Sequence, residues 1–133
     1  MLSKPRIIDF PNNGCLETGY IAIGENLKAV PFEIKRIFWA YYTPDSVLRG
    51  RHAHHDTQMI LIAAAGRIVV TTEILGYPPE VFILEKPNHG LYLPKLCWHT
   101  MQYSHNAVQI VIASTTYKET DYIRDYEQFK SIR

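Results

Sequence analysis

The sequence predicts an all-β protein with one short helix near its C-terminus. Proline and glycine interrupt the chain at short intervals, and the runs between them are rich in Val, Ile, Tyr, Phe and Thr. Short β-branched and aromatic runs separated by turn residues are typical of a β-sandwich or β-barrel. The length of 133 residues corresponds to one domain, which we assign to residues 1–133.

Nine strands are expected in the runs between the turn residues, because each run is apolar, β-branched or aromatic. They cover residues 21–23, 32–42, 51–53, 58–64, 66–73, 80–84, 90–93, 100–103 and 108–114. The turn residues that separate them are Pro31, Pro44, Gly50, Gly66, Gly76, Pro78, Pro79, Pro87, Gly90 and Pro94. The fourth run is almost continuously apolar, which indicates a buried strand.

Residues 119–129 (ETDYIRDYEQF) are predicted to form the helix. Thr120 can act as its N-cap, and acidic residues occupy the first turn. Tyr122, Tyr126 and Phe129 recur at helical spacing, so we expect these three side chains to pack the helix onto the β core.

Composition and charge exclude several classes of protein. Hydrophobic residues make up 47% of the chain and the formal net charge is +1, which excludes a disordered chain. This charge gives no electrostatic basis for binding nucleic acid or an anionic membrane. The longest apolar stretch, residues 59–65, is far shorter than the roughly 20 residues that span a bilayer. We therefore expect a cytoplasmic protein with neither a nucleic-acid nor a membrane partner.

Cys15 and Cys97 are too few for a disulfide framework, and neither lies in a C-x-x-C motif.

Residues 49–58 (RGRHAHHDTQ) give the strongest indication of a catalytic or metal-binding site. Side chains alternate along a strand, so His52 and His54 point to the same face with the small Ala53 between them. Two histidines on one face supply two metal ligands, or a general base with a partner. A pair of surface histidines is the alternative that the residues alone leave open.

The strand expected over residues 32–42 brings a positive charge into the fold. Alternation puts Arg36 on one face and Lys35 on the other, so whichever face is inward carries a cation. A buried charge needs a partner or a ligand, and the planar fork of an arginine suits phosphate oxygens. Both a structural ion pair and a phosphate clamp that includes Arg49 agree with this pattern.

The order Gly50, His-Ala-His, apolar strand, Gly66 and then Gly90, Pro94 and His99 resembles the two-part motif of the cupins. The resemblance implies an RmlC-like jelly-roll barrel with the histidines gathered inside. Metal-binding cupins add a glutamate shortly after the second histidine, where this chain has Gln58 and Met59. Glutamine is a poor ligand for a transition metal. We therefore expect no metal and no cofactor, and acid–base chemistry by histidine.

Four stretches more specifically resemble one cupin branch, the WxcM-like sugar nucleotide 3,4-ketoisomerases. They are VPFEIKRIFW, RGRHAH, PKLCWH and ASTTYKETDYIRDYEQF, and the resemblance extends over about residues 14–129. It implies an isomerase that converts dTDP-4-keto-6-deoxyglucose to a dTDP-3-keto-6-deoxyhexose, for the deoxy(amino)sugars of bacterial lipopolysaccharide O-antigen. The chain departs from its relatives at Met59, where they usually have glutamine, and near Asn13, where many have Arg-Gly.

The resemblance also implies roles for individual residues. His54 is expected to be the base that removes the C3 proton to give an enediolate, and the donor to C4. His52 is expected to orient it, or to carry the proton between O3 and O4. Arg36 and Arg49 are expected to hold the pyrophosphate. The further substrate-binding candidates are Tyr41, Tyr42, Tyr92, Trp98 and His99.

Two other functions stay open at this point. An RmlC-like sugar nucleotide epimerase would use the same proton chemistry on the same substrate, although such enzymes typically pair a histidine with an aspartate. A non-catalytic cupin that binds a nucleotide sugar would also have this fold.

The apolar side chains of the N-terminal segment predict that the protein forms a homodimer. Residues 6–23 carry seven large apolar side chains among turn residues: Ile7, Ile8, Phe10, Leu16, Tyr20, Ile21 and Ile23. The segment is too irregular for a self-contained hairpin, so we expect it to add as strands to a sheet of a second copy. This exchange would give a two-fold homodimer, as in the resembled family. The alternative is a strand that covers the protomer's own barrel.

Overall fold

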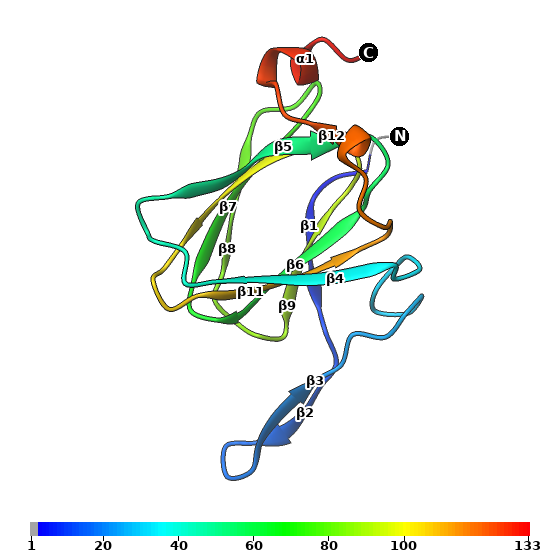
Figure 1. Cartoon of the computed structure of the whole chain (residues 1–133). Coiled ribbons are helices and arrows are strands. Elements are labelled where there is room, and N and C mark those ends of the chain that lie inside the picture. The colour runs from blue at the N-terminus through cyan, green and yellow to red at the C-terminus, as the bar shows by residue number, and fades with distance from the viewer. Residues whose placement is uncertain (1–2) are drawn as a thin grey trace.

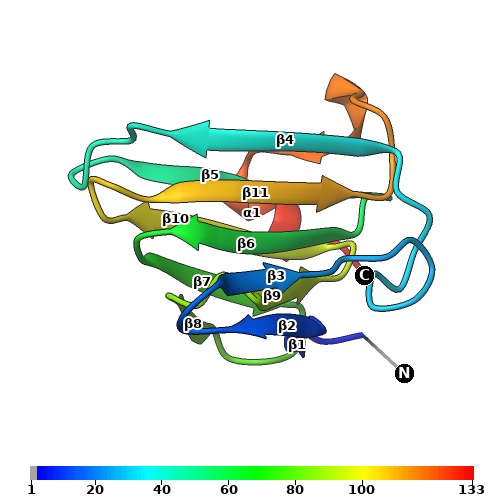
Figure 2. The same ribbon diagram turned by 90° about the horizontal axis from the view of Figure 1, so that it is seen from below.

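The computed structural model describes residues 3–133 and contains two five-stranded antiparallel sheets that face each other (Figures 1 and 2). The first sheet has the order β1 (Arg6–Asp9), β9 (His89–Leu93), β6 (Met59–Ala65), β11 (Val108–Ala113) and β4 (Arg36–Tyr41). The second has the order β12 (Tyr122–Ile123), β5 (Leu48–His54), β10 (Cys97–Tyr103), β7 (Ile68–Ile74) and β8 (Glu80–Leu84). The prediction of an all-β protein is confirmed.

The chain changes sheet at every connection from β4 to β12 except the one between β7 and β8. This alternation is a jelly-roll topology, in which strands distant in sequence become neighbours. All nine predicted strands are present, with ends that differ by up to four residues. No helix within residues 3–133 is both long enough and apolar enough to cross a membrane.

The inner faces of the two sheets form the main core. Along β7 every second residue is buried, as expected for a strand with one face against the core. Leu61, Leu91 and Val111 from the first sheet pack in the same cluster as Ile68 and Val70 from the second. Leu61 and Val111 of this cluster also line the pocket between the sheets, so the core and the pocket share a wall.

The outer face of the first sheet is also partly covered. Ile60 and Ile112 pack there against Phe10, Val30 and Phe32, which come from the chain before β4. Strand β6 is therefore buried on both faces, as its nearly continuous apolar sequence indicated.

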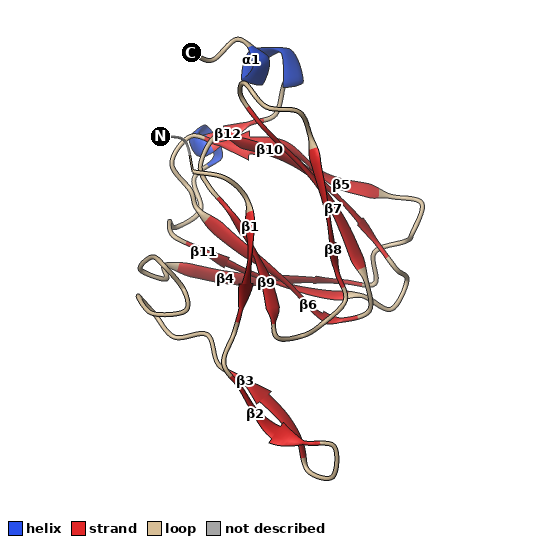
Figure 3. Ribbon diagram, turned by 180° about the vertical axis from the view of Figure 1, so that it is seen from behind, coloured by secondary structure: helices blue, strands red, loops and turns tan. Residues whose placement is uncertain are grey.

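The N-terminal segment differs from the expectation. Strand β1 pairs with β9 of the same chain, from Arg6 opposite Tyr92 to Asp9 opposite His89, so this part needs no second copy. Strands β2 (Asn12–Cys15) and β3 (Gly19–Ala22) form a hairpin that projects from the body of the molecule (Figures 1 and 3). The expectation that the segment is too irregular for a hairpin was wrong. Gly14 has φ +138° and its missing side chain lets the two strands approach closely.

The C-terminal helix is also shorter than predicted. A 3₁₀ turn (Glu119–Asp121) leads into strand β12, and only α1 (Tyr126–Lys130) is an α-helix. Asp125 lies two residues after the end of β12 and caps α1 by accepting a hydrogen bond from the Gln128 backbone amide at 3.1 Å. The apolar spacing was interpreted as one helix because the sequence does not show that β12 pairs with β5.

Candidate active site

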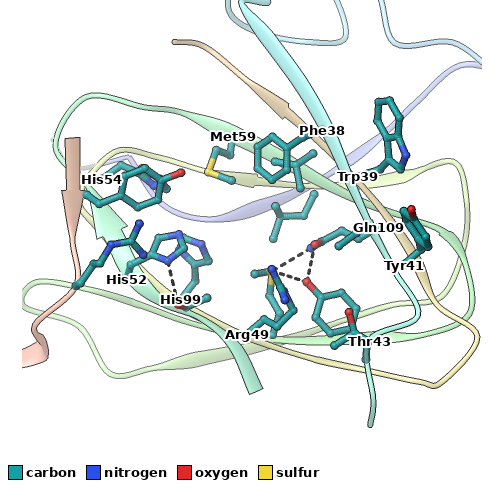
Figure 4. Close-up of a pocket in the computed structure, with 18 residues that line it drawn as sticks. Phe38, Trp39, Tyr41, Thr43, Arg49, His52, His54, Met59, His99 and Gln109 are labelled. Atoms are coloured by element: carbon teal, nitrogen blue, oxygen red, sulfur yellow. Dashed lines mark hydrogen bonds between the residues drawn. The ribbon is translucent and has the colours of Figure 1, made fainter. Parts of the chain in front are cut away.

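A pocket of about 440 Å³ opens between the two sheets (Figure 4). This volume lies within the range of roughly 300–1,000 Å³ typical of small-molecule sites. His52, His54 and His99 gather at one end of the pocket, and Arg49, Gln109 and Thr43 lie at the other. Met59 lines the wall between the two ends, so the residue that replaces the usual family glutamine faces the pocket.

A bulge in β5 aims the histidines into the pocket. His52 is opposite His99 of β10, whereas Gly50 is opposite Thr100, so Arg51 is an extra residue in β5. Gly50 has φ +83°, and a Cβ there would lie 2.8 Å from the carbonyl oxygen of His99. A side chain at this position would push the two strands apart, which explains the glycine next to the site.

The three imidazoles form one cluster. The ring centroid of His52 lies 4.9 Å from that of His54 and 4.7 Å from that of His99, and the latter two rings are 6.0 Å apart. His54 and His99 are almost fully buried, whereas His52 is partly exposed. The sequence analysis predicted the shared face of His52 and His54, and the structure confirms it.

Backbone carbonyls determine the tautomers of two of these histidines. Nδ1 of His52 lies 2.9 Å from the Gly50 carbonyl oxygen, and Nδ1 of His99 lies 3.1 Å from that of Cys97. Because a carbonyl only accepts, both Nδ1 atoms carry the proton, and each neutral ring keeps a lone pair on Nε2. Nε2 of His54 and Nε2 of His99 are buried and have no hydrogen-bond partner within residues 3–133. The cluster thus offers unpaired ring nitrogens to a ligand.

Burial keeps the cluster neutral. It lowers the pKa of His99 to about 3, and the charge of His52 acts in the same direction. Burial also lowers the pKa of His54 to about 4, followed by the charge of His52, while the carboxylate of Asp121 opposes the shift. The pKa of His52 is lowered by burial as well, although its hydrogen bond to Gly50 opposes this. Near neutral pH all three rings are proton acceptors.

The other end of the pocket is a polar group around Tyr103. Its hydroxyl donates to Oε1 of Gln109 at 2.6 Å, and the Gln109 amide donates to the sulfur of Met101 at 2.9 Å. Burial raises the pKa of Tyr103 to about 12, and the nearby Arg49 charge opposes the rise. Arg49 itself lines the pocket, as expected for a residue that binds an anionic part of a ligand.

Arg36 lies close to the histidine end. Its Cζ is 5.3 Å from the ring of Phe38 and 5.7 Å from that of Tyr117, and its Nε is buried with no partner within residues 3–133. Neither Arg36 nor Arg49 forms an ion pair in the part of the chain that the structure describes. The structural ion pair that the sequence left open for Arg36 is therefore not formed within residues 3–133.

Besides Arg36, which lies near His54 without lining the pocket, three further predicted substrate-binding residues do not line it. Trp98 points away from His99, its neighbour in the strand, and packs on Tyr126 and Phe129 at 5.3 and 5.7 Å between ring centroids. Tyr92 lies on the outer face of the first sheet, where its hydroxyl donates to Gln58 at 2.7 Å. Both side chains point away from the pocket because successive side chains of a strand point to opposite faces of the sheet.

Tyr42 is the third correction, because its side chain is 81% exposed beyond the end of β4. Tyr41 does reach the pocket and lies at its edge (Figure 4).

Sequence reasoning missed several residues that line the pocket. Tyr122 had been assigned to helix packing, yet its ring centroid is 4.5 Å from that of His54 and 5.0 Å from that of His52. Arg124, Tyr103 and Gln109 were not singled out at all. Tyr122 and Arg124 lie within ASTTYKETDYIRDYEQF, one of the four stretches that carry the family resemblance. That resemblance was the signal in the sequence that could have identified them.

Within residues 3–133 no group of three or more His, Cys, Asp and Glu side chains has an arrangement that could hold a metal ion. His52 meets both His54 and His99 edge to face, whereas the rings of His54 and His99 are nearly parallel, and His52 and His99 direct Nδ1 to backbone carbonyls.

Comparisons with known proteins show which family the chain resembles. The family model "FdtA: WxcM-like, C-terminal" matches residues 3–133. The chain is 39% identical over 111 residues to TDP-4-oxo-6-deoxy-alpha-D-glucose-3,4-oxoisomerase of Aneurinibacillus thermoaerophilus, which covers 83% of this chain and 78% of that protein.

Solved structures show the same relationship. A 3,4-ketoisomerase from Helicobacter canadensis is 36% identical with a TM-score of 0.89, covering 95% of this chain and 94% of that one. A mutant of the 3,4-ketoisomerase QdtA from Thermoanaerobacterium thermosaccharolyticum, in complex with TDP-4-keto-6-deoxyglucose, is 28% identical with a TM-score of 0.90 and covers 98% and 94%.

The RmlC epimerase of Mycobacterium tuberculosis is only 11% identical, with a TM-score of 0.73, and covers 89% of this chain and 66% of that one. It shares the fold alone, which confirms the prediction of an RmlC-like cupin.

The buried imidazoles make stability depend on pH. Their pKa values lie near 4 and 3 in the folded chain and near 6.5 when unfolded, so the unfolded chain binds more protons between these values. The free energy of unfolding should therefore fall by about 1–2 kcal/mol per buried imidazole between about pH 7 and pH 5. Urea unfolding at the two pH values measures this loss.

The variant His99→Asn is the matched comparison, because its amide can still donate to the Cys97 carbonyl. It should lose less stability on acidification than the wild-type protein. An equal loss in both would contradict a neutral, buried His99.

Proposed function

Because this chain belongs to the FdtA family of WxcM-like proteins, we propose that it isomerises TDP-4-keto-6-deoxyglucose to the 3-keto sugar nucleotide through the histidines of its pocket. It is an isomerase of TDP-sugars, like its named 3,4-ketoisomerase relatives. The single observation that carries the proposal is the cluster of neutral, unpaired imidazole nitrogens inside a pocket with inward arginines.

The reaction needs only proton transfers. A base takes the proton from C3, the C3–H electron pair forms a C3=C4 double bond, and the C4 carbonyl oxygen takes up the negative charge. The O3 proton moves to O4, the protonated base returns its proton to C4, and a carbonyl forms at C3. No electron leaves the sugar, so we propose that neither a metal nor a cofactor takes part.

The pocket suits this chemistry. A base must be neutral before it acts, and burial keeps the pKa of His54 well below neutral pH. The enediolate is an anion, and the charges of Arg36 and Arg124 act on His54 from nearby. The sequence hypothesis assigns the pyrophosphate to Arg36 and Arg49. Arg49 lines the pocket away from the histidines, which supports this role, whereas the charge of Arg36 acts on His54 and suits the enediolate.

The proton transfer is divided between two histidines. The sequence hypothesis makes His54 the base, and its unpaired Nε2 supports this role. A separate observation favours His52, since the Gly50 carbonyl holds its Nδ1 proton and leaves Nε2 free in the more accessible ring. Separate substitutions of the two histidines discriminate between these assignments.

An epimerase is the second candidate function, but nothing in the pocket favours it. The epimerase likeness is confined to the fold at 11% identity. A non-catalytic sugar-binding cupin does not require unpaired ring nitrogens at a site with nearby arginines. A cytoplasmic location and a role in O-antigen deoxysugars stay predictions.

We also propose a homodimer, now restricted to the β2–β3 hairpin as the exchanged element. Leu16 is 92% exposed and Ile21 is 69% exposed on this hairpin. Strand β4 is at the edge of the first sheet and exposes Ile37, Trp39 and Tyr41. An open edge next to apolar side chains is a surface that another strand can cover.

The first prediction from this proposal concerns the histidines. His54→Asn should reduce isomerisation by about 10²–10⁴-fold, because it removes a proton carrier, while the affinity for TDP stays unchanged. His52→Asn should also lower the rate of isomerisation, but less consistently than His54→Asn. Deuterium exchange at C3 in D₂O reports which of the two rings removes the proton. NMR of the product identifies the reaction.

The control is His55→Asn, which changes an exposed neighbour that does not line the pocket. Wild-type turnover by His54→Asn with continued C3 exchange would contradict His54 as the base. Loss of C3 exchange in His52→Asn alone would assign the base to His52.

The second prediction concerns assembly. At micromolar concentration, sedimentation should give the mass of two 15.4 kDa chains. Ile21→Asp should shift the protein toward monomer, because a charge on the hairpin opposes its burial. Val81→Asp, an exposed apolar position on β8, is the matched control and should stay dimeric. A wild-type monomer over this range would contradict the proposal.

A further inference from the structure

Arg124 lies in the pocket, but the proposed reaction so far gives it no contact with the sugar. Its Cζ lies 4.3 Å from the ring centroid of Tyr122, whose ring in turn contacts His52 and His54. Arg124 also lines the pocket itself. The guanidinium therefore lies at the histidine end, where the sugar reacts in the proposed function.

Glu119 holds this guanidinium by one edge. Nε of Arg124 donates to Oε1 of Glu119 at 2.8 Å, and Nη2 donates to Oε2 at 3.1 Å. The Tyr117 hydroxyl donates to the same carboxylate at 2.5 Å. The hydrogen bonds of Arg124 within the described residues use only Nε and Nη2, so the two N–H groups of Nη1 are free.

The energy of the pair does not by itself account for this arrangement. Both side chains are more than half exposed, at 53% for Arg124 and 59% for Glu119. Exposed ion pairs contribute only about 0–1 kcal/mol to stability. What the pair does provide is orientation, because a guanidinium bound along one edge and stacked on a ring has little freedom to turn.

The charge of Arg124 acts on both histidines that are assigned to proton transfer. It lowers the pKa of His52 and of His54, after the larger effect of burial in each case. The charge of Arg36 also lowers the pKa of His54, after burial and the charge of His52. When the C3 proton leaves the sugar, the new negative charge forms next to these rings, within the field of both arginines.

We propose that Arg124 is a catalytic residue that donates from Nη1 to the enediolate oxygen of the sugar, and that Glu119 is the positioning residue that holds it there. The inference rests on the proposed isomerase function and adds a role for residues of the Y-x-E-T-D-Y-I-R stretch. Arg124 makes no covalent bond, and it stabilises the charge that develops in the transition state.

The experiment measures kcat, KM and the affinity for TDP in four single variants and one double variant. Arg124→Met removes the charge with a side chain of similar length, and Arg124→Lys keeps the charge but loses the fork. Glu119→Gln weakens the hold on the arginine. Arg67→Met is the matched control, because it breaks the Arg67–Glu85 pair on the surface away from this pocket.

Arg124→Met should lower kcat by about 10²-fold, the lower end for loss of one oxyanion donor, with the TDP affinity unchanged. Arg124→Lys should recover part of this loss. Glu119→Gln should lower kcat less, and the double variant Arg124→Met with Glu119→Gln should match Arg124→Met alone. Arg67→Met should behave as wild type.

Two results overturn the inference while the wild-type enzyme still turns over. One is an Arg124→Met enzyme with wild-type kcat, and the other is a weakened TDP affinity without a change in kcat, which would assign Arg124 to the diphosphate. A wild-type protein without turnover would instead contradict the proposed function. Thermal unfolding of each variant separates a folded protein of low activity from an unfolded one.

Discussion

Burial of three imidazoles between two sheets is the constraint on which the rest of the pocket depends. A buried ring cannot keep a proton on both nitrogens without a partner for its charge, so the cluster is neutral. Neutrality gives the rings free lone pairs, and within residues 3–133 the same burial leaves the Nε2 atoms of His54 and His99 without a partner. Each unpaired buried nitrogen costs stability, and we propose that a polar group of the substrate provides the missing hydrogen-bond partner.

Only a few residues of the jelly-roll determine where the histidine cluster lies. The bulge at Gly50 and Arg51 aligns His52 with His99, and the Gly50 carbonyl then selects the His52 tautomer. Strand β12 closes the second sheet next to His54 and brings Tyr122 over the rings. A single local distortion of β5 therefore determines position, tautomer and contact with the C-terminal segment.

The sequence predicted the parts of the site that depend on local periodicity. His52 and His54 share a face because they are two residues apart in a strand, and the inward arginine followed from the same rule. Trp98 and Tyr92 were wrong because the sequence does not show which of two alternating faces is the inner one. For Tyr92, the neighbouring Leu91 and Leu93 occupy the inner face.

Residues that reach the site through long-range pairing could not be predicted. Tyr122 lies against His54 only because β12 pairs with β5. This pairing places Tyr122 opposite His54, a residue 68 positions earlier in the chain. Its spacing to Tyr126 and Phe129 fitted a helix, and tertiary pairing overrode that local pattern. For residues 6–9 the sequence left two partners open, a second copy and the protomer's own barrel, and the structure has the latter because β1 pairs with β9, far along the same chain.

The most direct test of the neutral cluster is ¹⁵N NMR of the histidine side chains at about pH 6, where a solvent-exposed imidazole is largely protonated. Single His→Asn variants assign the signals. We predict neutral rings for His54 and His99, and a proton on Nδ1 of His99. Imidazolium signals from His54 or His99 at this pH would contradict the account.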